Sequence, residues 1–346
     1  MRGMVYRLAR RMLILLGALN LVFQIFYWLP PNIARMDHNR DLWIYYDATQ
    51  KAAAGLSMYH RASRTYGPTE FPTWYVNPPQ LASVLYVFHG HPHLLNDVWY
   101  PLMVISFWAM AWGLATLSTG SSVGQVRGTR LASTLAWGGV LGLSPYFYYT
   151  MSVGNVEPVL WSAFALAVGS SRPNLLLAVM FSTKPYAMWP LIAYSEKHRK
   201  TIAVSIMVIF AGIFFAACVV GLGQFRDWVT LVGPSAGQGT FSSINLSLSM
   251  AVLRILRMAA VWHYTAGPLP QGPKLFLSAA GILGPALIYA MTRRLDLKWR
   301  MIWTYVAGML FSPLCWGIYL TNLWTAGALL MGNVKPFLVD KFESQA

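Results

Sequence analysis

Apolar runs close to the length of a membrane crossing recur along the chain, and the segments between them carry most of the charge. A helix needs about 20 mainly apolar residues to cross the hydrocarbon core of a bilayer, and fewer where it is short or broken. The runs are Met12–Leu29, Pro78–Phe88, Trp99–Leu117, Leu131–Tyr149, Val156–Val168, Leu175–Tyr194, Thr201–Leu222, Leu275–Met291, Met301–Pro313 and Trp316–Met331. They predict an all-α polytopic transmembrane bundle of about ten membrane helices, built as one integral membrane domain over residues 1–346.

The proportions of hydrophobic and charged residues exclude a soluble protein of this size. Of the 346 residues, 56% are hydrophobic and 11% are charged, whereas soluble domains carry about 25% charged residues. The net charge of +15 forms no basic face for nucleic acid, because the Lys and Arg residues stand in short clusters between apolar runs. Clusters of this kind mark cytoplasmic loops. They are Arg2/Arg7/Arg10/Arg11, Arg127/Arg130, Lys197/Arg199/Lys200 and Arg293/Arg294/Lys298/Arg300.

The start of the chain is typical of an uncleaved signal anchor with a cytoplasmic N-terminus. This orientation leaves residues 30–77 and 223–273 outside as two long loops. In the first loop we expect interfacial helices, for instance around Asp41–Gly55. In the second we expect a polar loop at Gly223–Ser243 and an interfacial helix at Leu246–Tyr264. The predicted location is the cytoplasmic membrane, with several crossings and with the polar motifs facing the non-cytoplasmic side.

Helix-breaking and polar elements share that outer side. Freed backbone groups in membrane helices are tolerated where they face protein or a wet cavity, so the elements together predict a cavity that opens outward. The alternative is that each Ser-Pro or Gly-Asn pair only ends a helix. The elements are Arg40–Tyr46, Asn77-Pro78-Pro79, Ser144-Pro145, Gly154–Glu157, Lys184-Pro185, Ser242–Ser247 and Ser312-Pro313.

Asp41 is the residue that we expect to act in catalysis. It follows the first apolar run, lies outside in the predicted topology and is flanked by aromatic residues. A carboxylate there could take a proton from an acceptor hydroxyl whose oxygen attacks a sugar carbon. Asp37 and Asp47 are rivals nearby. The alternative reading of Asp41 is a helix-start carboxylate or an ion-pair partner of Arg40.

Lys184 and Glu157 are the acid–base groups that lie deepest in apolar sequence. A charge at the middle of a membrane helix costs roughly 2.5–3.5 kcal/mol, so it usually has a purpose. Lys184, beside Pro185, could present its ammonium to a phosphate. The alternatives are snorkelling to the membrane surface or a structural Lys184–Glu157 pair.

Metal and nucleotide chemistry have little support in the sequence. The tract His89-Gly90-His91-Pro92-His93 contains a Gly and a Pro that prevent regular projection of the rings, and only Asp97 is a nearby carboxylate. There is no Asp-x-Asp pair, Gly-rich phosphate loop or His-Glu-x-x-His. We expect no metal and no cofactor.

The order of short motifs resembles the family 87 glycosyltransferases, membrane mannosyltransferases of the GT-C class that use polyprenyl-phosphate-mannose. The matching segments are Asp41-Leu-Trp-Ile-Tyr45, Gly55-Leu-Ser-Met-Tyr59, Val76-Asn77-Pro78-Pro79, Gly154-Asn155-Val156-Glu157, Lys184-Pro185, Asn245-Leu-Ser247-Leu and Ser312-Pro313-Leu-Cys-Trp316. They follow the family order over most of the chain. Two departures stand out, because Gly317-Ile318-Tyr319 replaces a His pair and Asn155 and Glu157 replace a Gln and an Asn.

The resemblance implies a GT-C fold and an inverting sugar transfer on the outer face. The family's catalytic Asp corresponds to Asp41, and polyprenyl phosphate is the leaving group. The donor is a lipid-linked hexose used as co-substrate, and the acceptor is a lipid or glycan. The residues implied in substrate binding are Lys184, Glu157, Asn155, Tyr45, Arg61, Arg64, His91, Asn245 and Tyr319.

Three other functions fit the same sequence. A secondary transporter would favour paired broken helices in two corresponding halves, and we see no such correspondence. A non-catalytic assembly subunit is compatible with the missing His pair. A transferase that moves phosphate or acyl groups onto lipids is the third. The sugar, the acceptor, the polyprenyl length and the oligomeric state are not encoded in any motif that we recognise.

Overall fold

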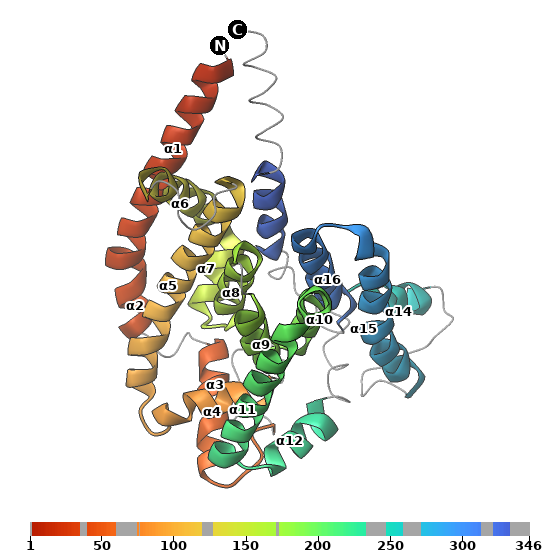
Figure 1. The fold of residues 1–346 in the computed structure, drawn as a ribbon. Coiled ribbons are helices and arrows are strands. Elements are labelled where there is room, and N and C mark those ends of the chain that lie inside the picture. The colour runs from red at the N-terminus through yellow and green to blue at the C-terminus, as the bar shows by residue number, and fades with distance from the viewer. Residues whose placement is uncertain are drawn as a thin grey trace. The chain divides into compact units, whose positions relative to one another are not determined.

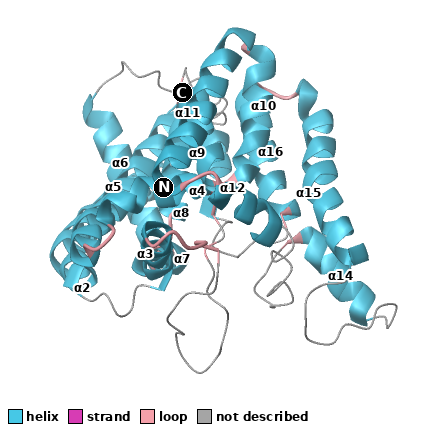
Figure 2. Cartoon of the chain, turned by 90° about the horizontal axis from the view of Figure 1, so that it is seen from below, coloured by secondary structure: helices cyan, strands magenta, loops and turns pink. Residues whose placement is uncertain are grey.

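The computed structural model describes residues 2–34, 40–59, 75, 77–119, 127–170, 173–232, 247–258, 271–312 and 321–332. Every regular element within these ranges is a helix, so the predicted all-α class is confirmed (Figures 1 and 2). The chain divides into two compact units. Unit 1 is Met1–Asn39, Asn96–Pro173 and Thr321–Ala346, and unit 2 is Arg40–Leu95 and Asn174–Leu320. The single membrane domain over residues 1–346 stays a prediction.

Four of the described helices are long and apolar enough to cross a membrane. They are Val5–Ala34, Pro92–Thr119, Arg199–Val220 and Leu275–Arg294. Several other apolar helices are shorter, with 10–17 residues, and at a rise of 1.5 Å per residue they extend over roughly 15–25 Å of the ~30 Å hydrocarbon core. The shorter helices are Pro79–Phe88, Glu157–Gly169, Asn174–Thr183 and Leu323–Gly332. The finer prediction of about ten crossings is therefore not confirmed.

The first apolar run of unit 1 forms one nearly continuous helix that is longer than the predicted Met12–Leu29. It consists of α1 (Arg2–Phe23), a π-helical turn η1 (Gln24–Trp28) and α2 (Leu29–Ala34). The π turn begins at the fully buried Gln24, whose Oε1 accepts from Trp108 Nε1 (2.8 Å) and whose Nε2 donates to the Tyr148 hydroxyl (3.2 Å). A buried amide needs such partners because its desolvation is costly. The widened turn thus coincides with a polar contact inside an apolar helix.

Among the other helices of unit 1, α6 packs against this first helix. Glycines allow close contact between α1 and α6, since a Cβ on Gly17 would lie 1.8 Å from the Leu135 carbonyl oxygen. The run predicted as one helix at Leu131–Tyr149 is divided at Ser144, because Pro145 has no N–H and takes the first position of a new helix. The helices are α5 (Pro92–Thr119), α6 (Arg127–Gly142), α7 (Pro145–Ser152), α8 (Glu157–Gly169) and Leu323–Gly332.

Unit 2 contains the remaining helices and confirms the predicted interruption at Lys184-Pro185. It also differs from the prediction at one place, because the segment expected to be a polar loop from Gly223 is helical as far as Val232. The elements are α3 (Arg40–Ala53), α4 (Pro79–Leu85), η3 (Tyr86–Phe88), α9 (Asn174–Thr183), η4 (Pro185–Ala187), α10 (Met188–Lys197), η5 (Arg199–Thr201), α11 (Ile202–Val220), α12 (Gly223–Asp227), η6 (Trp228–Val232), α14 (Leu248–Met258), α15 (Gln271–Met291), η7 (Thr292–Arg294) and α16 (Leu297–Phe311).

The two ends of helix α11 mark two opposite ends of unit 2. Its 19 residues extend over about 28 Å, close to the thickness of the hydrocarbon core. At one end, basic residues precede it at η5. At the other end, Gln224 of α12 clamps the turn after α3, because its Nε2 donates to the Leu56 carbonyl (2.9 Å) and its Oε1 accepts from the Met58 N–H (3.1 Å). The two segments predicted as outer loops thus meet at the same end of unit 2.

Candidate functional site

Helix α3 carries Asp41 in its first turn. Negative charge is favourable there and positive charge is favourable in the last turn, where Lys51 lies. Leu42, Tyr45 and Thr49 are buried, whereas Asp41 is half-exposed. The rival Asp47 is already engaged, since its carboxylate lies 2.7 Å from the Lys51 ammonium one turn later. The other rival, Asp37, lies outside the described residues.

Three buried tyrosines connect α3 with the start of α4. The ring of Tyr45, which lies on the same side of α3 as Asp41 at i+4, meets the ring of Tyr75 edge-on at 6.2 Å. Tyr59 contacts the same ring at 5.6 Å and donates through its hydroxyl to the Asn77 carbonyl (3.1 Å). Sequence reasoning singled out Tyr45 but missed Tyr75, although an aromatic residue just before Asn77-Pro78-Pro79 was a usable signal.

The Tyr75 hydroxyl holds the first turn of α4. It donates to the Pro78 carbonyl (3.0 Å) and accepts from the Ala82 N–H (2.9 Å). Burial raises the pKa of Tyr75 and of Tyr59 well above their ordinary value, and for Tyr59 the neighbouring Tyr75 and Asp227 add to the effect. Both phenols therefore stay protonated and serve as hydrogen-bond donors. They are unsuited to the role of general base.

Two amide oxygens beside these tyrosines are buried and unbonded. Asn77 is 3% exposed, and neither its Oδ1 nor the Oε1 of Gln80 has a hydrogen-bond partner among the groups that the structure describes. Buried polar groups in native proteins are nearly always bonded to protein or to ordered water. The first turn of α4 thus has two acceptors available for a water or a ligand hydroxyl.

Lys184 lies in the interruption that the sequence predicted. It takes an extended conformation (φ −140°, ψ 114°) between α9 and η4, and its side chain is half-buried. The following turn packs closely on α16, where a Cβ on Gly308 would lie 2.8 Å from the Tyr186 carbonyl oxygen. The ring of Tyr186 also meets that of Tyr305 edge-on at 5.5 Å. The position of the Lys184 break is therefore fixed from the α16 side.

Helix α4 is the element that α3 and α9 share. Both helices contact it, and α11 contacts both α4 and α9. At Gly212, halfway along α11, an added Cβ would come within 3.5 Å of Ser182 Oγ and 3.9 Å of Gln80 Cγ. The end of α9, two residues before Lys184, and the first turn of α4 thus meet near the middle of α11. Asp41 and Lys184 belong to the same unit, on elements that adjoin α4.

Asn155 and Glu157 belong to unit 1 and form the start of α8. Asn155 Oδ1 accepts from the Glu157 N–H (2.9 Å), which satisfies one of the unpaired donors of the first helical turn. Gly154 has φ +71°, and its carbonyl accepts from Trp99 Nε1 (3.0 Å). Glu157 is fully buried. The Asn155 side chain thus stabilises the start of α8.

The remaining candidates divide into exposed and undescribed residues. His91 is exposed, as are His89 and His93. Within the described ranges, no group of three or more His, Cys, Asp or Glu side chains is placed to hold a metal ion. The absence of a metal stays a prediction. The candidates Arg61, Arg64, Asn245 and Tyr319 lie outside the described residues.

Comparisons with protein-family models, with characterised proteins and with solved structures found no match for this chain.

Proposed function

We propose that the protein is a membrane glycosyltransferase that transfers a hexose, with mannose as our first choice, from a polyprenyl-phosphate donor. The acceptor is a lipid or glycan on the non-cytoplasmic face of the cytoplasmic membrane. One observation supports this proposal. The helix that carries a half-exposed carboxylate and the helix that ends before a lysine at a helix break share one short helix as a neighbour. Helix α3, which carries Asp41, and helix α9, which ends just before Lys184, both contact α4 in a unit with a membrane-length helix.

In the proposed reaction Asp41 acts as general base. Its carboxylate takes the proton of the acceptor hydroxyl while the hydroxyl oxygen forms a bond to C1 of the sugar. The bond from C1 to the phosphate oxygen breaks on the opposite face, and polyprenyl phosphate leaves with the electron pair. The configuration at C1 is therefore inverted.

Lys184 has the role of a phosphate-binding cation. Charge that develops on the leaving phosphate is stabilised most by a donor that is already positioned in a partly dry site. An extended residue between two helical segments suits this role, because its side chain is not restricted to a helix face. The buried acceptors of Asn77 and Gln80 are suited to hydroxyl groups of the sugar.

The test is sugar transfer in membranes supplied with labelled polyprenyl-phosphate-mannose and extracted membrane lipids. We expect Asp41→Asn to abolish transfer while the protein remains folded and inserted. Asp47→Asn is the matched control on the same helix and should retain activity. Loss of sugar transfer in Asp47→Asn, together with normal turnover in Asp41→Asn, would show that Asp41 is not the base.

The role of Lys184 has a separate measurement. Lys184→Ala should raise the KM for the lipid donor with a smaller effect on the KM for the acceptor, and Lys184→Arg should restore part of the donor affinity. Unchanged donor dependence in Lys184→Ala would remove this residue from the site. Transport of a solute into proteoliposomes without sugar transfer would favour a transporter, and retained function in Asp41→Ala would favour an assembly subunit.

A further inference from the structure

Two basic turns come together at the end of unit 2 that lies opposite Gln224. One joins α10 to α11 and the other joins α15 to α16. Together, residues 196–200 and 293–300 contain seven basic and two acidic side chains, a net charge of +5. We call the exposed basic members the basic patch. They are Lys197, Arg199, Lys200, Arg293, Arg294 and Lys298.

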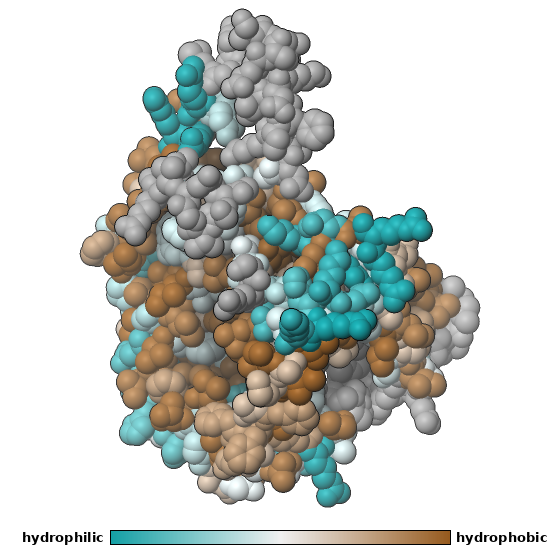
Figure 3. Space-filling view, in the orientation of Figure 1, coloured by the Kyte–Doolittle hydropathy of each residue, from teal (hydrophilic) through white to brown (hydrophobic). Residues whose placement is uncertain are grey.

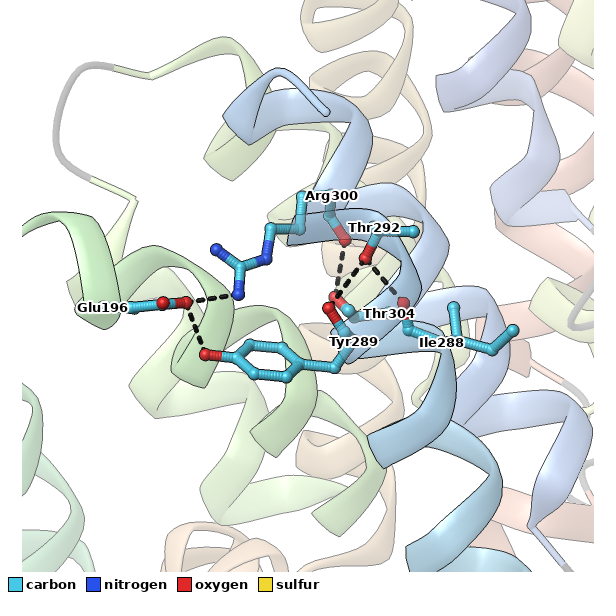
Figure 4. Close-up of polar contacts among 6 residues, drawn as sticks. All are labelled: Glu196, Ile288, Tyr289, Thr292, Arg300 and Thr304. Atoms are coloured by element: carbon cyan, nitrogen blue, oxygen red, sulfur yellow. Dashed lines mark hydrogen bonds and ion pairs between the residues drawn. The ribbon is translucent and has the colours of Figure 1, made fainter. Parts of the chain in front are cut away.

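An ion pair between a buried arginine and an exposed glutamate holds the two turns together. Arg300 of α16 is 1% exposed and donates through Nη2 to Glu196 Oε2 of α10, and the Tyr289 hydroxyl of α15 donates to the same oxygen (Figure 4). The Arg300 guanidinium also lies 4.2 Å from the centre of the Tyr289 ring, and that of Arg293 lies 5.8 Å from it. Three helices thus share one contact, which fixes the spacing of the two turns.

The acidic residues of these turns are already occupied. The hydrogen bonds from Tyr289 and Arg300 lower the pKa of Glu196 below its usual value, so this carboxylate stays ionised and paired. Asp296 Oδ1 accepts from the Lys298 N–H (2.9 Å) and caps the start of α16. The charge of the six exposed basic side chains is therefore not balanced by these two acids.

Exposed apolar side chains adjoin the basic patch along two helices of membrane length. Arg199 begins one such helix and Arg294 ends the other. Ile206 and Met207 follow Arg199 on α11, and Leu287 and Met291 precede Arg293 on α15, with exposures of 46–69%. Figure 3 shows hydrophilic side chains gathered beside apolar surface at this place. A partner that fits both surfaces has an anionic head and an apolar tail.

We propose that the basic patch binds the phosphate headgroup of an anionic phospholipid, whose acyl chains lie against the exposed apolar faces of α11 and α15. The neighbouring apolar faces favour a lipid over a free phosphate, because a soluble anion would leave them uncovered. Juxtamembrane basic residues are attracted to anionic lipid. The proposal does not depend on the reaction at Asp41.

The experiment is a lipid titration of the purified full-length chain in a neutral detergent at low salt. Bound dioleoyl phosphatidylglycerol and dioleoyl phosphatidylcholine are counted by native mass spectrometry. We expect phosphatidylglycerol to bind more tightly. Each basic residue near anionic lipid strengthens binding by about fivefold, so the triple variant Arg199→Gln/Lys200→Gln/Arg293→Gln should lose affinity for phosphatidylglycerol by roughly 100-fold. Affinity for phosphatidylcholine should not change.

Two controls separate the patch from general effects of charge. Arg226→Gln removes an exposed arginine at the other end of unit 2 and should leave binding unchanged, and Arg199→Lys/Arg293→Lys should retain it. Equal binding of the two lipids, equal loss in Arg226→Gln, or displacement of phosphatidylglycerol by an equal concentration of inorganic phosphate would each overturn the proposal.

Discussion

Replacement of Gly308 by alanine should displace the turn that follows Lys184. The added methyl group would lie 2.8 Å from the Tyr186 carbonyl oxygen, 3.2 Å from Trp189 Cδ1 and 3.3 Å from Tyr186 Cβ. The Tyr186 oxygen is a backbone atom and Tyr186 Cβ is bonded to the backbone, so neither can rotate away. Therefore η4 and α16 have to separate by a few tenths of an ångström. Overpacking of this kind typically costs about 1–3 kcal/mol.

The matched control is Gly327→Ala, because nothing lies within 4 Å of a Cβ at that helical position. There alanine should be neutral or stabilising by up to about 1 kcal/mol. Equilibrium unfolding in mixed micelles measures both variants, and sugar transfer measured in parallel should show a higher donor KM for Gly308→Ala. Equal stability of the two variants would show that the contact between η4 and α16 is looser than the structure has it, and the reasoning about Lys184 would fail with it.

Two further predictions concern the ends of unit 2. Tyr75→Phe removes the hydroxyl that bonds the Pro78 carbonyl and the Ala82 N–H, and it should destabilise the fold by about 1–3 kcal/mol. Equilibrium unfolding measures this loss. The control is Tyr27→Phe, at an exposed position where no cost is expected. Glu196 has a lowered folded-state pKa, so its pair stabilises the fold above the ordinary Glu pKa of about 4.3 and loses this contribution as the pH falls through the folded value. Unfolding midpoints from about pH 5 to about pH 3 should therefore fall more steeply for the wild type than for Glu196→Gln. The difference should be modest because the Glu196 side chain is 41% exposed. Parallel curves for the two proteins would contradict a stabilising role of the Glu196 pair.

The local pattern of the sequence was sufficient for most helix positions and for several breaks. Pro145 and Pro185 lack an N–H and start new helical segments, so the divisions at Ser144 and Lys184 follow from covalent chemistry. The helix at Asp41–Gly55 and the amphipathic helix within Leu246–Tyr264 also follow from local pattern. Sequence hydropathy did not give the number of membrane-length helices, because breaks inside apolar runs leave segments shorter than a crossing.

Contacts between distant residues were beyond the reach of sequence reasoning. Nothing in the sequence pairs Gln224 with the turn at Leu56–Met58, or Glu196 with Tyr289 and Arg300, because these contacts join residues up to 168 positions apart. The same holds for Tyr75, whose hydroxyl acquires its role only when the chain folds back at Pro78.

The sequence by itself determined that the chain is helical and strongly apolar, and where its basic clusters lie, since these properties depend on residues that are neighbours along the chain. Only the tertiary structure decided that the helices beside Asp41 and Lys184, α3 and α9, both contact α4 and that two basic turns form one patch. The physical reason is that side-chain packing and ion pairing depend on distance in space, and separation along the chain does not specify that distance.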